Sequence, residues 1–132
     1  MPDYVVYHNP DKRGFSAAEC KDFRVLTSNT VPNEVIGSRI WLLTGEGRPR
    51  KYYLASTFIA ENVTHDDVEG FQNCISAAIG QMFRPMIRID EENWFPDFLY
   101  HQGNFAFGFG VIREEQVVNG LRLLWNQPAP AS

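Results

Sequence analysis

Hydrophobic residues along most of the chain recur with the two-residue period of β-strands. Residues 3 to 8 place apolar side chains on both sides of an extended chain, so we expect a central strand there. The other predicted strands are rich in β-branched or aromatic residues: residues 23 to 27, a hairpin with arms 38 to 44 and 50 to 62, residues 83 to 89, and residues 105 to 112. Pro85 places the strand 83 to 89 at a sheet edge or a bulge.

Helical signals are fewer. Ser16 with Glu19 forms a capping-box pattern for a short helix, and Asp90 is expected to cap another that carries Trp94 and is limited by Pro96. From residue 113 the period becomes helical, with an apolar stripe formed by Val117, Leu121, Leu124 and Trp125. Residues 63 to 80 are ambiguous, because the apolar run at 75 to 79 fits a strand or a helical turn.

Length and composition indicate one globular domain over residues 1 to 126. Residues 127 to 132 read as a linker that leads to a further domain. No apolar run approaches the ~20 residues of a membrane span, and the start has no signal-peptide pattern, so a cytoplasmic location without membrane partners is expected. Cys20 and Cys74 lack metal-site or disulfide-framework spacing and are expected to be small buried hydrophobes.

The charge of the chain limits how it could bind nucleic acid. A net charge of −4 argues against binding nucleic acid by overall electrostatics. Basic residues are nevertheless grouped around the predicted hairpin, where their alternative role is simple solvation. The candidates for contact with a nucleic-acid backbone are Arg39, Arg48, Arg50 and Lys51.

Catalytic and cofactor motifs are missing from the sequence. His65, Asp66 and Asp67 are adjacent without a third ligand nearby, which favours a solvated turn over a metal site. Gly108 and Gly110 lack a third glycine at dinucleotide spacing. We therefore expect no catalytic residues, no metal and no cofactor in this domain.

The order of elements carries a family resemblance. A first strand ending in Tyr7-His8-Asn9, a short helix, the loop Thr27-Ser28-Asn29, and a hairpin from Ile40-Trp41-Leu42-Leu43 to Tyr52-Tyr53-Leu54-Ala55 resemble the PUA-like superfamily, above all its EVE and YTH branches. The resemblance implies an α+β fold built on a strongly curved β-barrel flanked by short helices. It also implies a modified base flipped into an aromatic pocket, and some EVE-type modules are fused to HNH nucleases.

The resemblance places polar pocket residues at the end of the first strand and in the loop after the second. EVE domains usually carry a Lys near the end of strand one and a Trp in the following loop, whereas this chain has no Trp before Trp41. The pocket candidates are Tyr7, His8, Asn9, Ser28, Asn29, Trp41 and Trp94. Core packing is the leading alternative for Trp41, and a backbone hydrogen bond is the leading alternative for His8.

The resulting hypothesis is a binding module that flips a modified cytosine or methyladenine out of DNA, as the specificity domain of a modification-dependent restriction endonuclease. The same fold would also suit a reader of modified or structured RNA. Two other classes stay open. A small ASCH-like hydrolase or nuclease would need Lys, Glu or His clustered in one cleft, and a protein-interaction domain would need an exposed aromatic patch.

Overall fold

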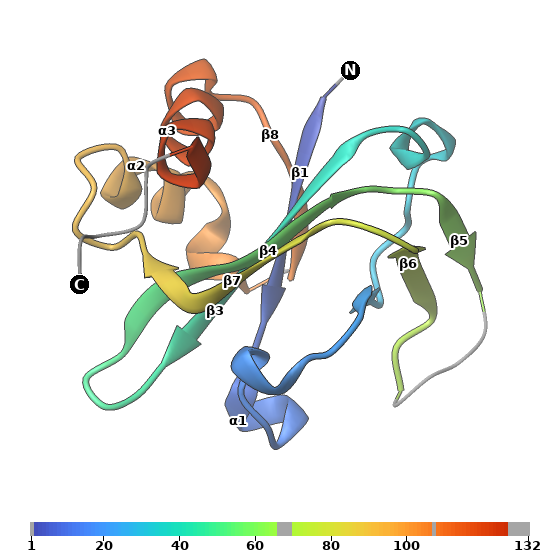
Figure 1. The fold of residues 1–132 in the computed structure, drawn as a ribbon, viewed down its shortest axis with the longest axis horizontal. Coiled ribbons are helices and arrows are strands. Elements are labelled where there is room, and N and C mark those ends of the chain that lie inside the picture. Colours follow the sequence, from blue (N-terminus) through green and yellow to red (C-terminus); the bar gives the residue numbers. More distant parts are fainter. Residues whose placement is uncertain (1, 66–69, 107, 127–132) are drawn as a thin grey trace.

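The computed structural model describes residues 2–65, 70–106 and 108–126, and it combines short helices with strands arranged in two sheets (Figure 1). The predicted α+β class is confirmed. Within the described ranges, the hydrogen-bonded strand pairs leave both sheets open, and the structure does not show the predicted strongly curved β-barrel.

The larger sheet contains the first strand at an inner position. Its order is β7-β4-β3-β1-β8. The strands are β1 (Asp3–His8), β3 (Arg39–Glu46), β4 (Lys51–Ile59), β7 (Gln81–Arg88) and β8 (Phe109–Ile112). β1 runs parallel to β3, with Tyr4 opposite Ile40 and Tyr7 opposite Leu43. The predicted central position of residues 3 to 8 is therefore confirmed, and β7 with Pro85 lies at an edge as expected.

The smaller sheet has the order β2-β6-β5, with β2 (Phe23–Thr27), β6 (Asn73–Ala77) and β5 (Asn62–Thr64). The ambiguous apolar run thus begins as a strand. The second arm of the hairpin ends at Ile59, and the prediction that it reaches Asn62 is wrong. The chain passes from one sheet to the other there: the Ala60 amide donates to the carbonyl of Ser38, just before β3, and the Glu61 amide donates to the carbonyl of Ser76 in β6.

Alternation along the strands builds two cores on opposite faces of the larger sheet. Val5 and Trp41 pack toward the helices, whereas Val6 and Ile40 pack toward the smaller sheet. Because each face of the sheet covers a core, β1 and β3 carry apolar residues on both faces. The helices α2 and α3 and the strands β5 and β6 accordingly lie on opposite sides of the larger sheet in Figure 1.

The helix α2 (Phe95–His101) begins later than predicted. Trp94 occupies its N-cap position, and Asp90 accepts hydrogen bonds from Arg88 instead of capping the helix. Pro96 lies in the first turn, where a missing N–H costs nothing, so it starts the helix and does not limit it. The predicted C-terminal helix is confirmed as α3 (Glu115–Asn126), with Val117 and Leu121 fully buried.

Short helical turns connect the strands: α1 (Pro10–Arg13), η1 (Ala17–Glu19), η2 (Asn33–Val35) and η3 (Gly103–Phe105). The predicted capping box is confirmed, since Ser16 accepts from the Ala18 amide and Glu19 accepts from the Ser16 amide. Asn9 caps α1 by accepting from two amides of that turn. These caps fix the loop that follows β1.

The strand predicted over 105 to 112 is shorter in the structure, because β8 begins at Phe109 and residues 103 to 105 form η3. Two outward carbonyls of this edge strand accept side-chain amides. Asn29 Nδ2 donates to Phe109 O at 3.4 Å, and Gln102 Nε2 donates to Val111 O at 3.1 Å.

No helix within the described part of the chain is long and apolar enough to cross a membrane. The predicted linker 127 to 132 and the residues Asp66 and Asp67 lie outside the described residues.

Candidate functional site

Two adjoining hollows lie where the end of β1 passes the end of β2, beside α1. We call the first the aromatic cleft; its volume is about 280 Å³. It is lined by Tyr7, Asn9, Lys12, Arg13, Leu26, Thr27, Ser28, Asn29, Phe71, Phe105, Ala106 and Gly108. We call the second the polar chamber; its volume is about 160 Å³. It is lined by Val6, Tyr7, His8, Arg13, Phe15, Cys20, Asp22, Arg24, Val25, Leu26 and Leu42.

Stacked rings form one wall of the aromatic cleft. Tyr7 and Phe105 lie nearly parallel, with ring centroids 5.0 Å apart and an interplanar angle of 8°. Phe105 has a φ of 62° and Asn104 a φ of 56°, which is a left-handed conformation that a bulky side chain rarely adopts. Strained backbone of this kind persists where the surrounding structure fixes it, and it clusters at ligand-binding sites.

The Tyr7 hydroxyl extends toward the hairpin formed by β3 and β4. Arg50 Nη1 donates to it at 3.4 Å, and the hydroxyl lies against Gly45, where any β-carbon would collide with it. Burial raises the pKa of Tyr7, and the nearby Arg50 guanidinium partly offsets that increase. The phenol is therefore a neutral donor and acceptor at physiological pH.

Two cations lie against the Phe71 ring, which also lines the cleft. Lys12 Nζ lies 5.1 Å from the centroid of the Phe71 ring, and the Arg13 guanidinium carbon lies 5.4 Å from it. Arg13 also lies 4.9 Å from the Phe15 ring, so its guanidinium sits between an aromatic ring of each hollow. Cation–π contacts at partly exposed sites contribute about 0.5–1 kcal/mol each, enough to orient these side chains.

The polar wall is held by a chain of amide hydrogen bonds. The backbone N–H of Asn29 donates to Thr27 Oγ1 at 3.1 Å, and Asn73 Nδ2 donates to the backbone carbonyl of Asn29 at 2.7 Å. Asn73 Oδ1 in turn accepts from His65 Nδ1 at 2.6 Å. Asn73 is buried, so this chain fixes the loop of Ser28 and Asn29 at the mouth of the cleft.

The hairpin tip lies beside α1. Arg50 Nη2 is 2.8 Å from Asp11 Oδ2, and Arg48 Nη2 is 4.0 Å from Asp11 Oδ1. The side chain of Arg48 is 90% exposed, and Lys51 is exposed as well. Arg39 lies at the other end of β3, about 23 Å away at ~3.3 Å per residue, so it does not belong to this group.

The structure brings together four of the predicted pocket residues, since Tyr7, Asn9, Ser28 and Asn29 line the aromatic cleft. His8 points to the other side of β1 and lines the polar chamber. It is 4% exposed, and its Nε2 donates to the Phe15 carbonyl at 2.7 Å, the backbone contact that was its alternative.

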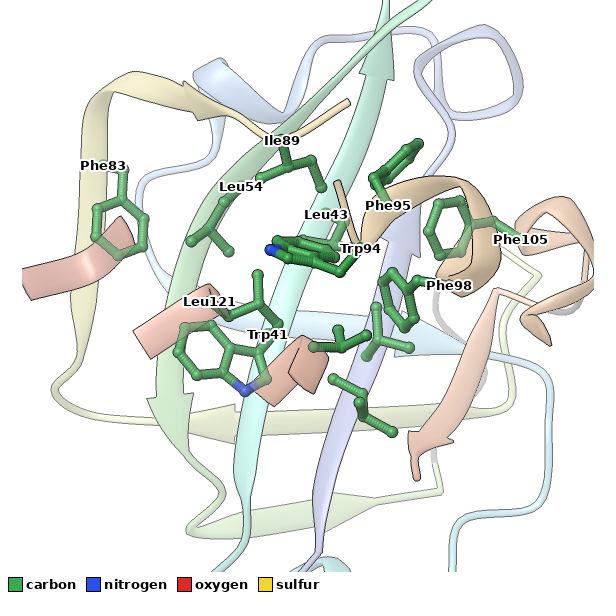
Figure 2. Packing of buried hydrophobic residues seen from close by; sticks show 13 residues of the cluster. Trp41, Leu43, Leu54, Phe83, Ile89, Trp94, Phe95, Phe98, Phe105 and Leu121 are labelled. Atoms are coloured by element: carbon green, nitrogen blue, oxygen red, sulfur yellow. The ribbon is translucent and has the colours of Figure 1, made fainter. Parts of the chain in front are cut away.

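The prediction that Trp41 and Trp94 line the pocket is wrong. Trp41 is 0% exposed and Trp94 is 7% exposed. Both lie among leucine, isoleucine and phenylalanine side chains beneath the helices, as Figure 2 shows. Trp41 Nε1 donates to Asp3 Oδ2 at 2.8 Å, which satisfies its polar atom inside the core.

Sequence reasoning missed Phe71, Phe105, Lys12 and Arg13, although all four line the cleft. The adjacent basic pair after the Asn9 cap was the one signal available locally. Phe71 and Phe105 lie far along the chain from β1, and no local pattern connects them to it.

Other chemistry is sparse. Among the described residues, no group of three or more His, Cys, Asp or Glu could hold a metal ion. His101 Nδ1 lies 3.3 Å from Glu114 Oε1 near the end of β8, outside both hollows. Within the part of the chain that the structure describes, the lining of the cleft contains a lysine and an arginine but no carboxylate or histidine.

Comparison of the chain with protein-family models, with curated proteins and with solved structures finds no match.

Proposed function

We propose that this chain is a non-enzymatic module of the PUA-like class that binds a modified base, flipped out of DNA, in the aromatic cleft. In this proposal it supplies specificity to a nuclease on the same polypeptide. The observation that carries the proposal is the combination, in one hollow, of ring faces, amide groups and two cations. The PUA-like resemblance of the sequence supports the choice of a base as the ligand.

The chemistry of the lining suits a flat, heteroatom-rich ring. Tyr7 and Phe71 offer aromatic surface, and Ser28 and Asn29 offer groups able to hydrogen-bond a base edge. Phe105 is only 5% exposed and contributes by stacking against Tyr7. Stacking contributes ~1–3 kcal/mol per base, which is comparable to the few kcal/mol that flipping costs. A modified base that is easier to unstack, or that fills the cleft better, would therefore be preferred.

Charge is distributed in the way such a ligand requires. The chain has a net charge of −4, but Lys12, Arg13, Arg48 and Arg50 gather around one end of β1, where the nearby carboxylates are Asp11 and Glu46. A local basic edge of this kind supports backbone contacts beside the cleft without strong nonspecific binding.

Binding assays with matched duplexes test the proposal. Fluorescence anisotropy at fixed salt would compare an unmodified duplex with duplexes carrying one 5-methylcytosine, 5-hydroxymethylcytosine, 5-carboxylcytosine or N6-methyladenine. We expect tighter binding of at least one modified duplex, and Phe71→Ala should weaken that binding about 10- to 100-fold. Tyr100→Ala, which removes an aromatic ring that is 78% exposed on α2, is the matched control and should change nothing.

Equal affinity for all these duplexes would contradict the proposal. A preference for a modified single-stranded RNA over every duplex would keep the cleft but assign it to RNA.

A further inference from the structure

The polar chamber adjoins the aromatic cleft closely enough to contact the same ligand. The two hollows share Tyr7, Arg13 and Leu26 in their linings. Arg13 lies between them, its guanidinium stacked near Phe15 on the chamber side and near Phe71 on the cleft side. A group attached to a base in the cleft therefore has the chamber as its neighbouring space.

Positive charge predominates around the chamber. Arg13 and Arg24 line it together with one carboxylate, that of Asp22. Arg84 adds a third guanidinium nearby, because its nitrogens donate to the carbonyls of Ala18 and Cys20. The chamber is thus surrounded by groups that attract an anion.

The pKa of the Cys20 thiol, which lines the chamber, reflects the same nearby charges. Burial raises its pKa, which is the dominant effect, but Arg13, Arg84 and Arg24 each lower it by favouring the thiolate. Asp22 acts in the opposite direction. The net effect is a raised pKa, so the guanidinium groups reduce the cost of negative charge beside Cys20 without outweighing burial and Asp22.

The rest of the lining is mostly apolar. Val6, Val25, Leu26 and Leu42 are buried and form the inner wall, whereas Arg24 and Asp22 are exposed to solvent. The planar guanidinium group matches the geometry of carboxylate and phosphate oxygens. A chamber of about 160 Å³ has room for such a group but not for a second stacked nucleotide.

We propose that the polar chamber binds an anionic, oxygen-bearing group of the nucleotide whose base occupies the aromatic cleft, with Arg24 and Arg13 as its ligands. This inference rests on the proposed function. The anion has two possible sources with the same chemistry: a carboxylate substituent on the base, or a phosphate of the flipped nucleotide.

Charge variants of the full chain test the proposal. Arg24→Met removes a cation from the chamber, Asp22→Asn removes its carboxylate, and Lys21→Met removes an exposed cation that does not line it. Affinities would be measured at fixed salt for duplexes carrying unmodified cytosine, 5-methylcytosine or 5-carboxylcytosine, with thermal midpoints as the check on folding.

We expect Arg24→Met to weaken binding about tenfold or more, Asp22→Asn to strengthen it, and Lys21→Met to change it less than about twofold. A loss confined to the 5-carboxylcytosine duplex identifies the base substituent as the anion. An equal loss for all three duplexes identifies a phosphate. If Arg24→Met binds every duplex as Lys21→Met does, the chamber proposal is overturned.

The two proposals fail in different ways. Wild-type protein that discriminates modified from unmodified duplexes, combined with an Arg24→Met variant that matches Lys21→Met, overturns the chamber and leaves the base-binding cleft intact. Wild-type protein that discriminates no modification, or binds no duplex, overturns the proposed function and the chamber with it.

Discussion

Asp90 does not cap α2, but it stabilises the turn that precedes this helix. It follows β7 and receives two hydrogen bonds from Arg88, from Nε at 2.6 Å and from Nη2 at 3.2 Å. The Arg88 guanidinium lowers the pKa of Asp90 below its ordinary value of 3.8, while partial burial acts against that shift. This two-point contact braces the turn that leads into α2.

Asp90→Asn should lower the free energy of unfolding by about 1 kcal/mol at pH 7, because it replaces a charge-assisted contact that is partly exposed to solvent. A carboxylate with a depressed pKa stabilises the fold fully above its ordinary pKa and progressively less as the pH falls through its folded-state value. The difference between wild type and variant should therefore shrink from about pH 4 downward. Denaturant titrations at pH 7 and pH 3 would measure it, and a difference independent of pH would contradict this account.

Residue roles were predictable where the partner is near in sequence. Ser16 and Glu19 are three positions apart, and their capping box follows from that spacing. The partner of Trp41 is Asp3, 38 positions away, so its sequence neighbourhood did not decide between the core and a pocket. Tyr7 and Asn29 were placed at one site through the family resemblance, while Phe71 and Phe105 required the folded chain.

At the scale of elements, α3 packs closely against the core at Gly120. Trp94, at the start of α2, lies so close to Gly120 that a β-carbon there would overlap the indole nitrogen. Gly in a helix interior costs roughly 1 kcal/mol relative to Ala, so its position in α3 is explained by packing and not by helix propensity.

Gly120→Ala should therefore destabilise the protein by about 1–3 kcal/mol, because overpacking against Trp94 exceeds the gain in helix propensity. Asn119→Ala, at an exposed position of the same helix, is the matched control and should be neutral or slightly stabilising. Urea unfolding of both variants would compare them. A Gly120→Ala variant as stable as wild type would show that α3 shifts away from Trp94 without cost.

Elements with strong local signals were predicted with their bounds nearly correct, as β1, β2 and α3 show. The division into two sheets was not, because it depends on backbone pairing between β2 and β6, about 50 residues apart. The turn η3 was also not predicted, because Asn104 and Phe105 adopt a left-handed backbone conformation that their side chains disfavour in isolation.

At the scale of the molecule, the cationic groups are segregated. The hairpin tip and α1 form one basic edge, where the side chain of Arg48 is 90% exposed. Arg113 is exposed at the far end of β1, because β8 pairs Ile112 with Asp3. The first group lies beside the two hollows, where Arg24 also lines the polar chamber.

Arg48→Ala is expected to weaken modified and unmodified duplexes alike, and to reduce the slope of log K against log salt concentration by about one. Arg113→Ala should leave that slope unchanged. Salt titrations of binding for both variants would decide. A loss selective for the modified duplex would place Arg48 in base recognition instead of backbone contact.

The two edges of the larger sheet have a consequence for how copies of the chain meet one another. Pro85 removes an N–H donor from β7, and the amides of Asn29 and Gln102 occupy outward carbonyls of β8. Exposed edge strands template strand addition, the first step toward domain-swapped oligomers and fibrils. With both of its edges obstructed, the larger sheet disfavours strand addition from another copy of the chain, even where copies are crowded.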